Sequence, residues 1–114
     1  MMAITKAQLP TTVHDVIKKI RDGYHPEKII VFGSYARGTQ TETSDLDLLV
    51  IKDTDERWLD RVRQVSGLLT PRRLPMDIIV KTPEEVDDAL RERELFMREI
   101  TEEGVVAYER GESA

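Results

Sequence analysis

Cysteine is absent from this chain of 114 residues, and its apolar runs are only a few residues long. Without cysteine there is no disulfide and no zinc–thiolate site, and a cytoplasmic location is the default expectation. A membrane-spanning helix needs about 20 mostly apolar residues, so no membrane segment is predicted. The opening residues Met1–Lys6 also lack the apolar region of a signal peptide.

Histidine and tryptophan are scarce as well. The two histidines, His14 and His25, have no cluster of other metal-ligand residues near them in the sequence, so we interpret both as structural or surface residues. The single tryptophan, Trp58, is predicted to pack in the core. The length suits one domain covering residues 1–114, with residues 109–114 expected to form a frayed tail.

Negative charge exceeds positive charge, and the excess is uneven. The net charge is −5, and residues 83–114 hold 11 of the 22 acidic side chains but only 4 of the 17 basic ones. Such an acidic segment repels the nucleic-acid backbone, so no direct nucleic-acid binding is expected. We interpret it as a solvated helix surface, the usual role of charge runs; contact with a basic partner protein is the alternative.

Apolar periodicity and turn residues predict alternating helices and strands. Val13, Val16, Ile17 and Ile20 follow the spacing of one helix face. The predicted helices cover about residues 12–22, 54–69, 83–91 and 93–103, with a short helical turn at 34–37. Gly23 is expected to end the first helix. Capping boxes are expected to start two others, formed by Asp53 with Glu56 and by Thr82 with Glu85, with Pro83 at the first helical position. The predicted strands cover about residues 28–32, 46–52, 76–81 and 105–108. This order indicates an α/β fold (α+β) in which helices flank a central sheet.

The stretch between the first two strands carries the first functional signal. It runs from Gly33 to Asp47 and reads GSYARGTQTETSDLD. A glycine at a strand end lets the backbone approach a ligand closely, and the free N–H groups that open the following turn can hold a phosphate. Ser34 adds a hydroxyl donor. Taken alone, Gly-Ser turns are common and most of them bind nothing.

Three aspartates strengthen this signal. Asp45 and Asp47 are two residues apart and therefore share one strand face. Neighbouring acids on a strand repel each other, and a divalent metal is the usual remedy. Asp77 lies on a strand expected nearby, where it can complete a two-metal site and accept a proton from an attacking hydroxyl. The structural alternative makes Asp45 a turn cap and Asp77 a strand-edge acid; it explains each acid singly but the set poorly.

Together these residues form the pattern Gly-Ser-x10-Asp-x-Asp. The pattern resembles the signature of the DNA polymerase beta-like nucleotidyltransferase superfamily, and the wording FGSYARGTQTETSDLDLLV is similar to the minimal nucleotidyltransferases. The resemblance implies a small mixed sheet of about four strands flanked by helices. It implies that Gly33 and Ser34 hold the triphosphate and that Asp45 and Asp47 bind two magnesium ions. It makes Asp77 the third carboxylate and the base.

Basic side chains are secondary candidates for phosphate contacts. Arg37 lies in the Tyr-Ala-Arg-Gly segment of the resemblance, where a salt bridge to the polar connector is an equal alternative. The lower-ranked candidates are Lys52, Arg72, Arg73 and Lys81.

The reaction that the resemblance implies is transfer of a nucleoside monophosphate, AMP from ATP, to a hydroxyl group, with pyrophosphate leaving. Minimal nucleotidyltransferases resemble the antitoxin of a pair with a HEPN-domain ribonuclease toxin, in which AMP is added to a tyrosine of the toxin. An oligomer with such a partner is therefore expected. The alternatives are an antitoxin that acts by covering its toxin without catalysis, and transfer to a small molecule such as an aminoglycoside.

Overall fold

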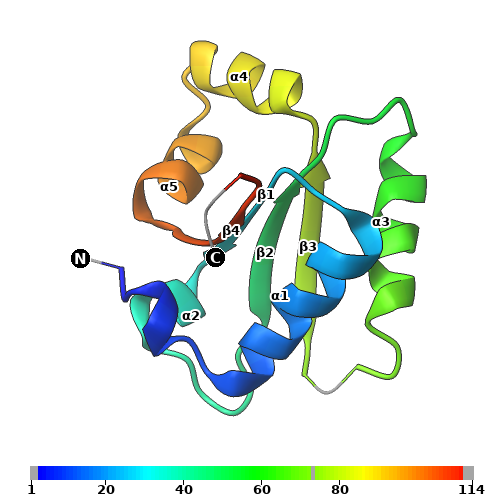
Figure 1. Ribbon diagram of the computed structural model, residues 1–114. Helices are drawn as coiled ribbons and strands as arrows, with labels where there is room; N and C mark the ends of the chain where they lie inside the picture. Colours follow the sequence, from blue (N-terminus) through cyan, green and yellow to red (C-terminus); the bar gives the residue numbers. More distant parts are fainter. Residues whose placement is uncertain (1–2, 73, 112–114) are drawn as a thin grey trace.

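A computed structural model describes residues 3–72 and 74–111. Its centre is a four-stranded sheet in the order β3-β2-β1-β4 (Figure 1). The strands are β1 (Lys28–Phe32), β2 (Leu46–Ile51), β3 (Met76–Lys81) and β4 (Val105–Glu109). β1 is antiparallel to β2 and β4, whereas β2 and β3 are parallel. The sheet is therefore mixed, which confirms the predicted fold class.

Helices cover both faces of this sheet (Figure 1). The helical elements are η1 (Lys6–Gln8), α1 (Thr11–Tyr24), α2 (Ser34–Arg37), α3 (Trp58–Leu68), α4 (Pro83–Arg91) and α5 (Leu95–Glu103). α1 and α3 pack on one face, and α4 and α5 pack on the other. The single turn α2 lies at the sheet end where β1 passes into β2. None of the helices in the described residues is both long enough and apolar enough to span a bilayer.

Strand alternation divides the core into two layers. Leu48 and Val50 of β2 face α1 and α3, in the larger cluster. Leu49 and Ile51 face the smaller cluster, which includes Ile100 of α5. β2 has neighbours on both edges and helices over both faces, which explains why its residues form a nearly continuous apolar run.

The first helix is two residues longer at its end than predicted, because Gly23 does not terminate it. A Cβ on Gly23 would lie 2.6 Å from Leu68 Cδ2, so the glycine allows α1 and α3 to approach closely. The helix ends instead at Tyr24, and the C-cap residue His25 has a left-handed φ of 55°. Tertiary packing, rather than a C-terminal cap, explains this glycine.

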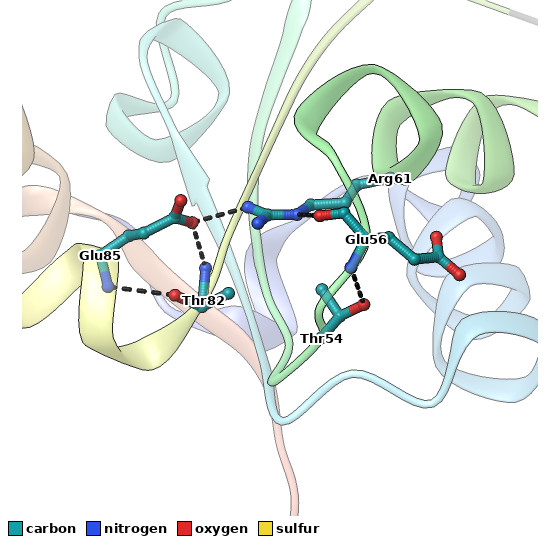
Figure 2. Close-up of polar contacts among 5 residues, drawn as sticks. All are labelled: Thr54, Glu56, Arg61, Thr82 and Glu85. Carbon is teal, nitrogen blue, oxygen red and sulfur yellow. Dashed lines mark hydrogen bonds and ion pairs between the residues drawn. The ribbon is translucent and has the colours of Figure 1, made fainter.

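The start of α3 also differs from the prediction. The expected capping box of Asp53 and Glu56 does not start this helix, which begins at Trp58. The Glu56 N–H donates to Thr54 Oγ1 (3.1 Å), and its carbonyl accepts from Nε of Arg61 (2.7 Å), as Figure 2 shows. Trp58 is 59% exposed, so its predicted core position is wrong.

Arg61 links this segment to the start of α4. Its guanidinium is buried and donates to Glu85 Oε1 at 2.6 Å. The same oxygen accepts the N–H of Thr82 at 2.8 Å, and Thr82 Oγ1 accepts the N–H of Glu85 at 3.1 Å (Figure 2). This capping box was predicted from the sequence, with Pro83 in the first turn, and is confirmed.

The chain remains ordered slightly beyond the predicted end of the last strand. Glu109, the last residue of β4, pairs with Lys28 of β1, and the N–H of Arg110 donates to the carbonyl of Glu27 at 2.8 Å. The predicted fraying at 109 therefore begins too early, because backbone pairing with β1 continues. Residues 112–114 of that predicted tail lie outside the described residues.

Candidate active site

Gly33 joins β1 to α2 in a conformation that favours glycine. Its φ is 72° and its ψ is −150°, a region that is essentially restricted to glycine. A Cβ built at this position would lie 2.2 Å from Oδ2 of Asp47. The backbone angle therefore favours glycine, any Cβ would displace the Asp47 side chain, and the Asp47 carboxylate lies directly against the turn.

The turn after Gly33 presents backbone donors. The N–H groups of Ala36 and Arg37 donate to the Gly33 carbonyl at 3.1 and 3.2 Å. The N–H groups of Ser34 and Tyr35 precede these bonds and have no acceptor within the helix. Gly33 and Ser34 thus lie where the sequence predicts a phosphate-binding turn, and their role in binding stays a prediction.

The predicted acidic residues lie at the same end of the sheet. Asp47 and Asp77 are direct partners in the parallel register of β2 and β3, so their side chains leave the same face. Asp45 precedes β2 by one residue. Burial, followed by the charges of Asp77 and Asp45, raises the pKa of Asp47, and Arg37 opposes this. Asp47 is thus a partly buried carboxylate in a negative environment.

The turn before β2 has its own closing contacts. The Thr41 N–H donates to Ser44 Oγ at 2.8 Å, and the Ser44 N–H donates to the Thr41 carbonyl at 3.1 Å. Ser44, not Asp45, therefore makes the contacts that close this turn.

Within residues 3–72 and 74–111, no three acidic or histidine side chains converge as a ready metal site. The three aspartates stay a predicted ligand set.

A cavity of about 250 Å³ opens beside Asp47. Its near wall is formed by the end of β1 and by α2, and its far wall by α5, which lies above α2 in Figure 1. The lining residues are Phe32, Gly33, Ala36, Arg37, Asp47, Phe96, Glu99, Ile100 and Glu103. Cavities of about 430 and 570 Å³ lie elsewhere, but neither is lined by the glycine turn or by any of the three aspartates. Chemistry rather than volume therefore identifies the candidate site.

The α5 wall was not predicted as part of the site. Phe96, Glu99 and Glu103 recur at the spacing of one helix face, which is the sequence signal that could have identified them. That signal was masked because an acidic helix surface is usually just solvated.

The basic side chains that were predicted to contact phosphate do not all lie at the candidate site. Arg37 lines the cavity. Lys52 Nζ donates to the Tyr24 backbone carbonyl and lies over the Tyr24 aromatic ring. Arg72 donates to Ser66 Oγ at 2.9 Å. Arg73 lies outside the described residues. Lys81 is the last residue of β3, four residues beyond Asp77, and does not line the cavity. Among these candidates, Arg37 is therefore the one that we retain for phosphate binding.

The mixed four-stranded sheet with helices over both faces is the fold of a nucleotidyltransferase domain. The family model of the nucleotidyltransferase domain matches residues 13–107, and the chain belongs to that family. It is 36% identical over 84 residues to "Putative protein adenylyltransferase MJ0604" of Methanocaldococcus jannaschii, an alignment that covers 72% of this chain and 78% of that protein.

Solved structures share the fold at lower sequence identity. A nucleotidyltransferase from Sulfolobus solfataricus, described as putative, superposes with a TM-score of 0.65 at 22% identity, covering 95% of this chain and 86% of that one. A toxin–antitoxin crystal structure with AMP-PNP gives a TM-score of 0.62 at 21% identity, covering 90% and 76%. At these identities the likeness shows the fold alone.

Proposed function

We propose that this nucleotidyltransferase transfers AMP from ATP to a hydroxyl group on a partner protein, with magnesium bound. The observation that carries the proposal is the contact between the Gly33 turn and Asp47 at the edge of a cavity. A glycine turn suited to a phosphate thus lies against a carboxylate suited to a cation. The pairing of Asp47 with Asp77 supports the same assignment.

The triphosphate binds at the start of α2. The N–H groups of Ser34 and Tyr35, together with the Ser34 hydroxyl, donate to phosphate oxygens. Arg37, on the cavity wall, adds a positive charge beside them. Because α2 is a single turn, these individual donors, rather than a long helix dipole, provide the attraction.

The aspartates suit magnesium by their chemistry. Magnesium takes oxygen ligands and is usually held by one or two carboxylates plus substrate phosphates, so a ready three-acid cluster is not required. Asp45 and Asp47 would hold the ions, with Asp77 adjacent. When bound, the metal offsets negative charge on the transferring phosphoryl group and on the leaving pyrophosphate.

Asp77 acts as the general base. It is exposed at its position next to Asp47, so an acceptor can approach it from solvent. The acceptor hydroxyl loses its proton to the Asp77 carboxylate as its oxygen attacks the α-phosphorus. A new oxygen–phosphorus bond forms, the bond to pyrophosphate breaks, and AMP remains on the acceptor.

The acceptor that we propose is a tyrosine of a HEPN-domain toxin, which makes this chain the antitoxin of the pair. The relative in Methanocaldococcus jannaschii is named as a protein adenylyltransferase, and a structural neighbour is described as a toxin–antitoxin complex. Both support a protein acceptor over a small molecule. Residues 1–114 form the single nucleotidyltransferase domain in this proposal.

Co-expression with the candidate toxin tests the proposal. Intact-mass spectrometry should find one or more AMP groups on the toxin, and Asp47→Ala should remove them. Asp15→Ala, an exposed acid on α1, is the matched control and should leave the modification intact. If Asp47→Ala still neutralises the toxin and the wild-type protein leaves it unmodified, the chain acts by covering its toxin and the proposal is wrong.

A further inference from the structure

One face of α5 forms the wall of the candidate site opposite the glycine turn. Phe96, Glu99, Ile100 and Glu103 all line the cavity, and their spacing places them along a single helix face. Ile100 is buried against the sheet and anchors the helix there. The other three side chains are exposed, so the sequence of α5 directs one aromatic ring and two carboxylates towards this space.

The two carboxylates are not explained by the stability of the helix. Glu99 and Glu103 are four residues apart, and like charges at that spacing destabilise a helix. The ion pairs formed within the described residues include Arg98 with Glu102 (3.1 Å) on α5, but neither Glu99 nor Glu103 takes part in one. Their position on the cavity therefore suggests a role in binding.

Charge determines the direction in which a nucleotide can lie. The α5 wall carries two carboxylates, whereas the opposite wall carries Arg37 and Asp47, the carboxylate that we assign to magnesium. Phosphate oxygens are attracted to the α2 wall and repelled by α5. Carboxylates are acceptors only, so the groups of a nucleotide that suit Glu99 and Glu103 are its hydrogen-bond donors, the sugar hydroxyls and the base amino group.

The aromatic ring completes this wall. Phe96 is 49% exposed, and its ring meets that of Phe32 edge-on, with centroids 5.7 Å apart and an interplanar angle of 80°. This contact orients the ring without covering it. An exposed aromatic face suits a nucleobase, because stacking is tolerant of base identity and makes a substantial contribution to binding.

We propose that α5 forms the nucleoside half of the active site. The base stacks on Phe96, Glu99 and Glu103 accept hydrogen bonds from the sugar hydroxyls or base amino group, and the triphosphate extends across the cavity to Gly33. This inference rests on the proposed function and adds to it the residues that recognise the nucleoside.

Calorimetry with two ligands tests the inference, with magnesium present throughout. One ligand is an ATP analogue that is not cleaved between the α- and β-phosphates, and the other is inorganic tripolyphosphate, which has no nucleoside. Phe96→Ala should weaken binding of the analogue about tenfold and leave tripolyphosphate binding unchanged. Phe96→Tyr, which keeps the ring, should restore analogue binding. Leu95→Ala is the matched control, because Leu95 is 67% exposed and does not line the cavity.

Replacing Glu99 and Glu103 should change the affinities for the two ligands in opposite directions. Replacing both Glu99 and Glu103 by alanine removes repulsion, so tripolyphosphate should bind more tightly. The ATP analogue should bind less tightly, because its hydroxyl and amino donors lose their acceptors. Equal tightening for both ligands would show that these acids do not touch the nucleoside.

Fluorescence provides a second measurement. In a Trp58→Phe background, Phe96→Trp places the single tryptophan on the α5 wall, and the analogue should quench its emission whereas tripolyphosphate should not. No difference between the two ligands, or equal loss of both by Phe96→Ala, would overturn the assignment of Phe96. If the wild-type protein binds neither ligand, the proposed function itself fails; if it binds both and Phe96→Ala changes neither, only this inference fails.

Discussion

Gly33→Ala should damage both the stability and the activity of this protein. The substitution forces alanine into a backbone region used almost only by glycine, at a cost of about 1–3 kcal/mol. The new Cβ would also lie 2.2 Å from Asp47 Oδ2, so the Asp47 side chain must leave its rotamer, at a further cost of about 0.5–1.5 kcal/mol. We expect the free energy of unfolding to fall by about 2–4 kcal/mol.

Urea denaturation measures this loss, and transfer of labelled AMP to the acceptor measures activity. For a domain of this size, each kcal/mol lowers the melting temperature by about 4 °C. Gly67→Ala is the matched control, because a Cβ there meets nothing within 4 Å and the residue lies within α3. That control should gain about 0.5–1 kcal/mol from helix propensity and keep full activity.

A double-mutant cycle separates the two costs of Gly33→Ala. Asp47→Ala removes the carboxylate that the new Cβ would meet, so in that background only the backbone cost should remain. The difference between the two backgrounds should be about 0.5–1.5 kcal/mol. If Gly33→Ala is as stable and active as the wild-type protein, the close packing of the turn on Asp47 is incorrect and the argument for the site fails with it.

The remaining predictions concern the acids, the phosphate turn and the Arg61 network. Asp45→Asn should abolish magnesium-dependent AMP transfer while leaving the thermal melting curve intact or improved, because a repulsion is relieved; a large loss of stability would make Asp45 structural. Ser34→Ala should weaken tripolyphosphate binding in calorimetry, and unchanged affinity would argue against the turn. Burial raises the pKa of Glu85, but hydrogen bonds from the Thr82 N–H and from Arg61 outweigh it, so the pKa lies below its usual value of 4.5. The stability that this carboxylate contributes is therefore present above pH 4.5 and is lost as pH falls below that value. Glu85→Gln should accordingly lose less stability on acidification than the wild type, as melting temperatures across that range would show.

Local signals predicted several boundaries correctly. β1 and α2 have the predicted bounds because an apolar run, a glycine and a helical turn follow one another directly. The start of α4 was equally readable, because the Thr82 capping box requires only residues three positions apart. The local signals that failed belong to residues at which packing between elements outweighed the local pattern. Gly23 lies within α1 and packs against Leu68 of α3. α3 begins at Trp58, beyond Asp53, and its Arg61 bonds the Glu56 carbonyl and Glu85 of α4.

The residues of the candidate site also divide into those that local sequence places and those that tertiary contacts place. The pattern from Gly33 to Asp47 lies within one strand–turn–strand segment, so the order of residues was enough to place the turn and the acid together. The adjacency of Asp77 to Asp47 depends on parallel pairing between β2 and β3, which strand patterns alone do not specify. The cavity needs still more, because Phe96 meets Phe32 only after the chain has crossed the sheet and returned along α5. Residues that are close in the sequence determine local turns, caps and motifs, whereas contacts between distant segments form only when the core packs.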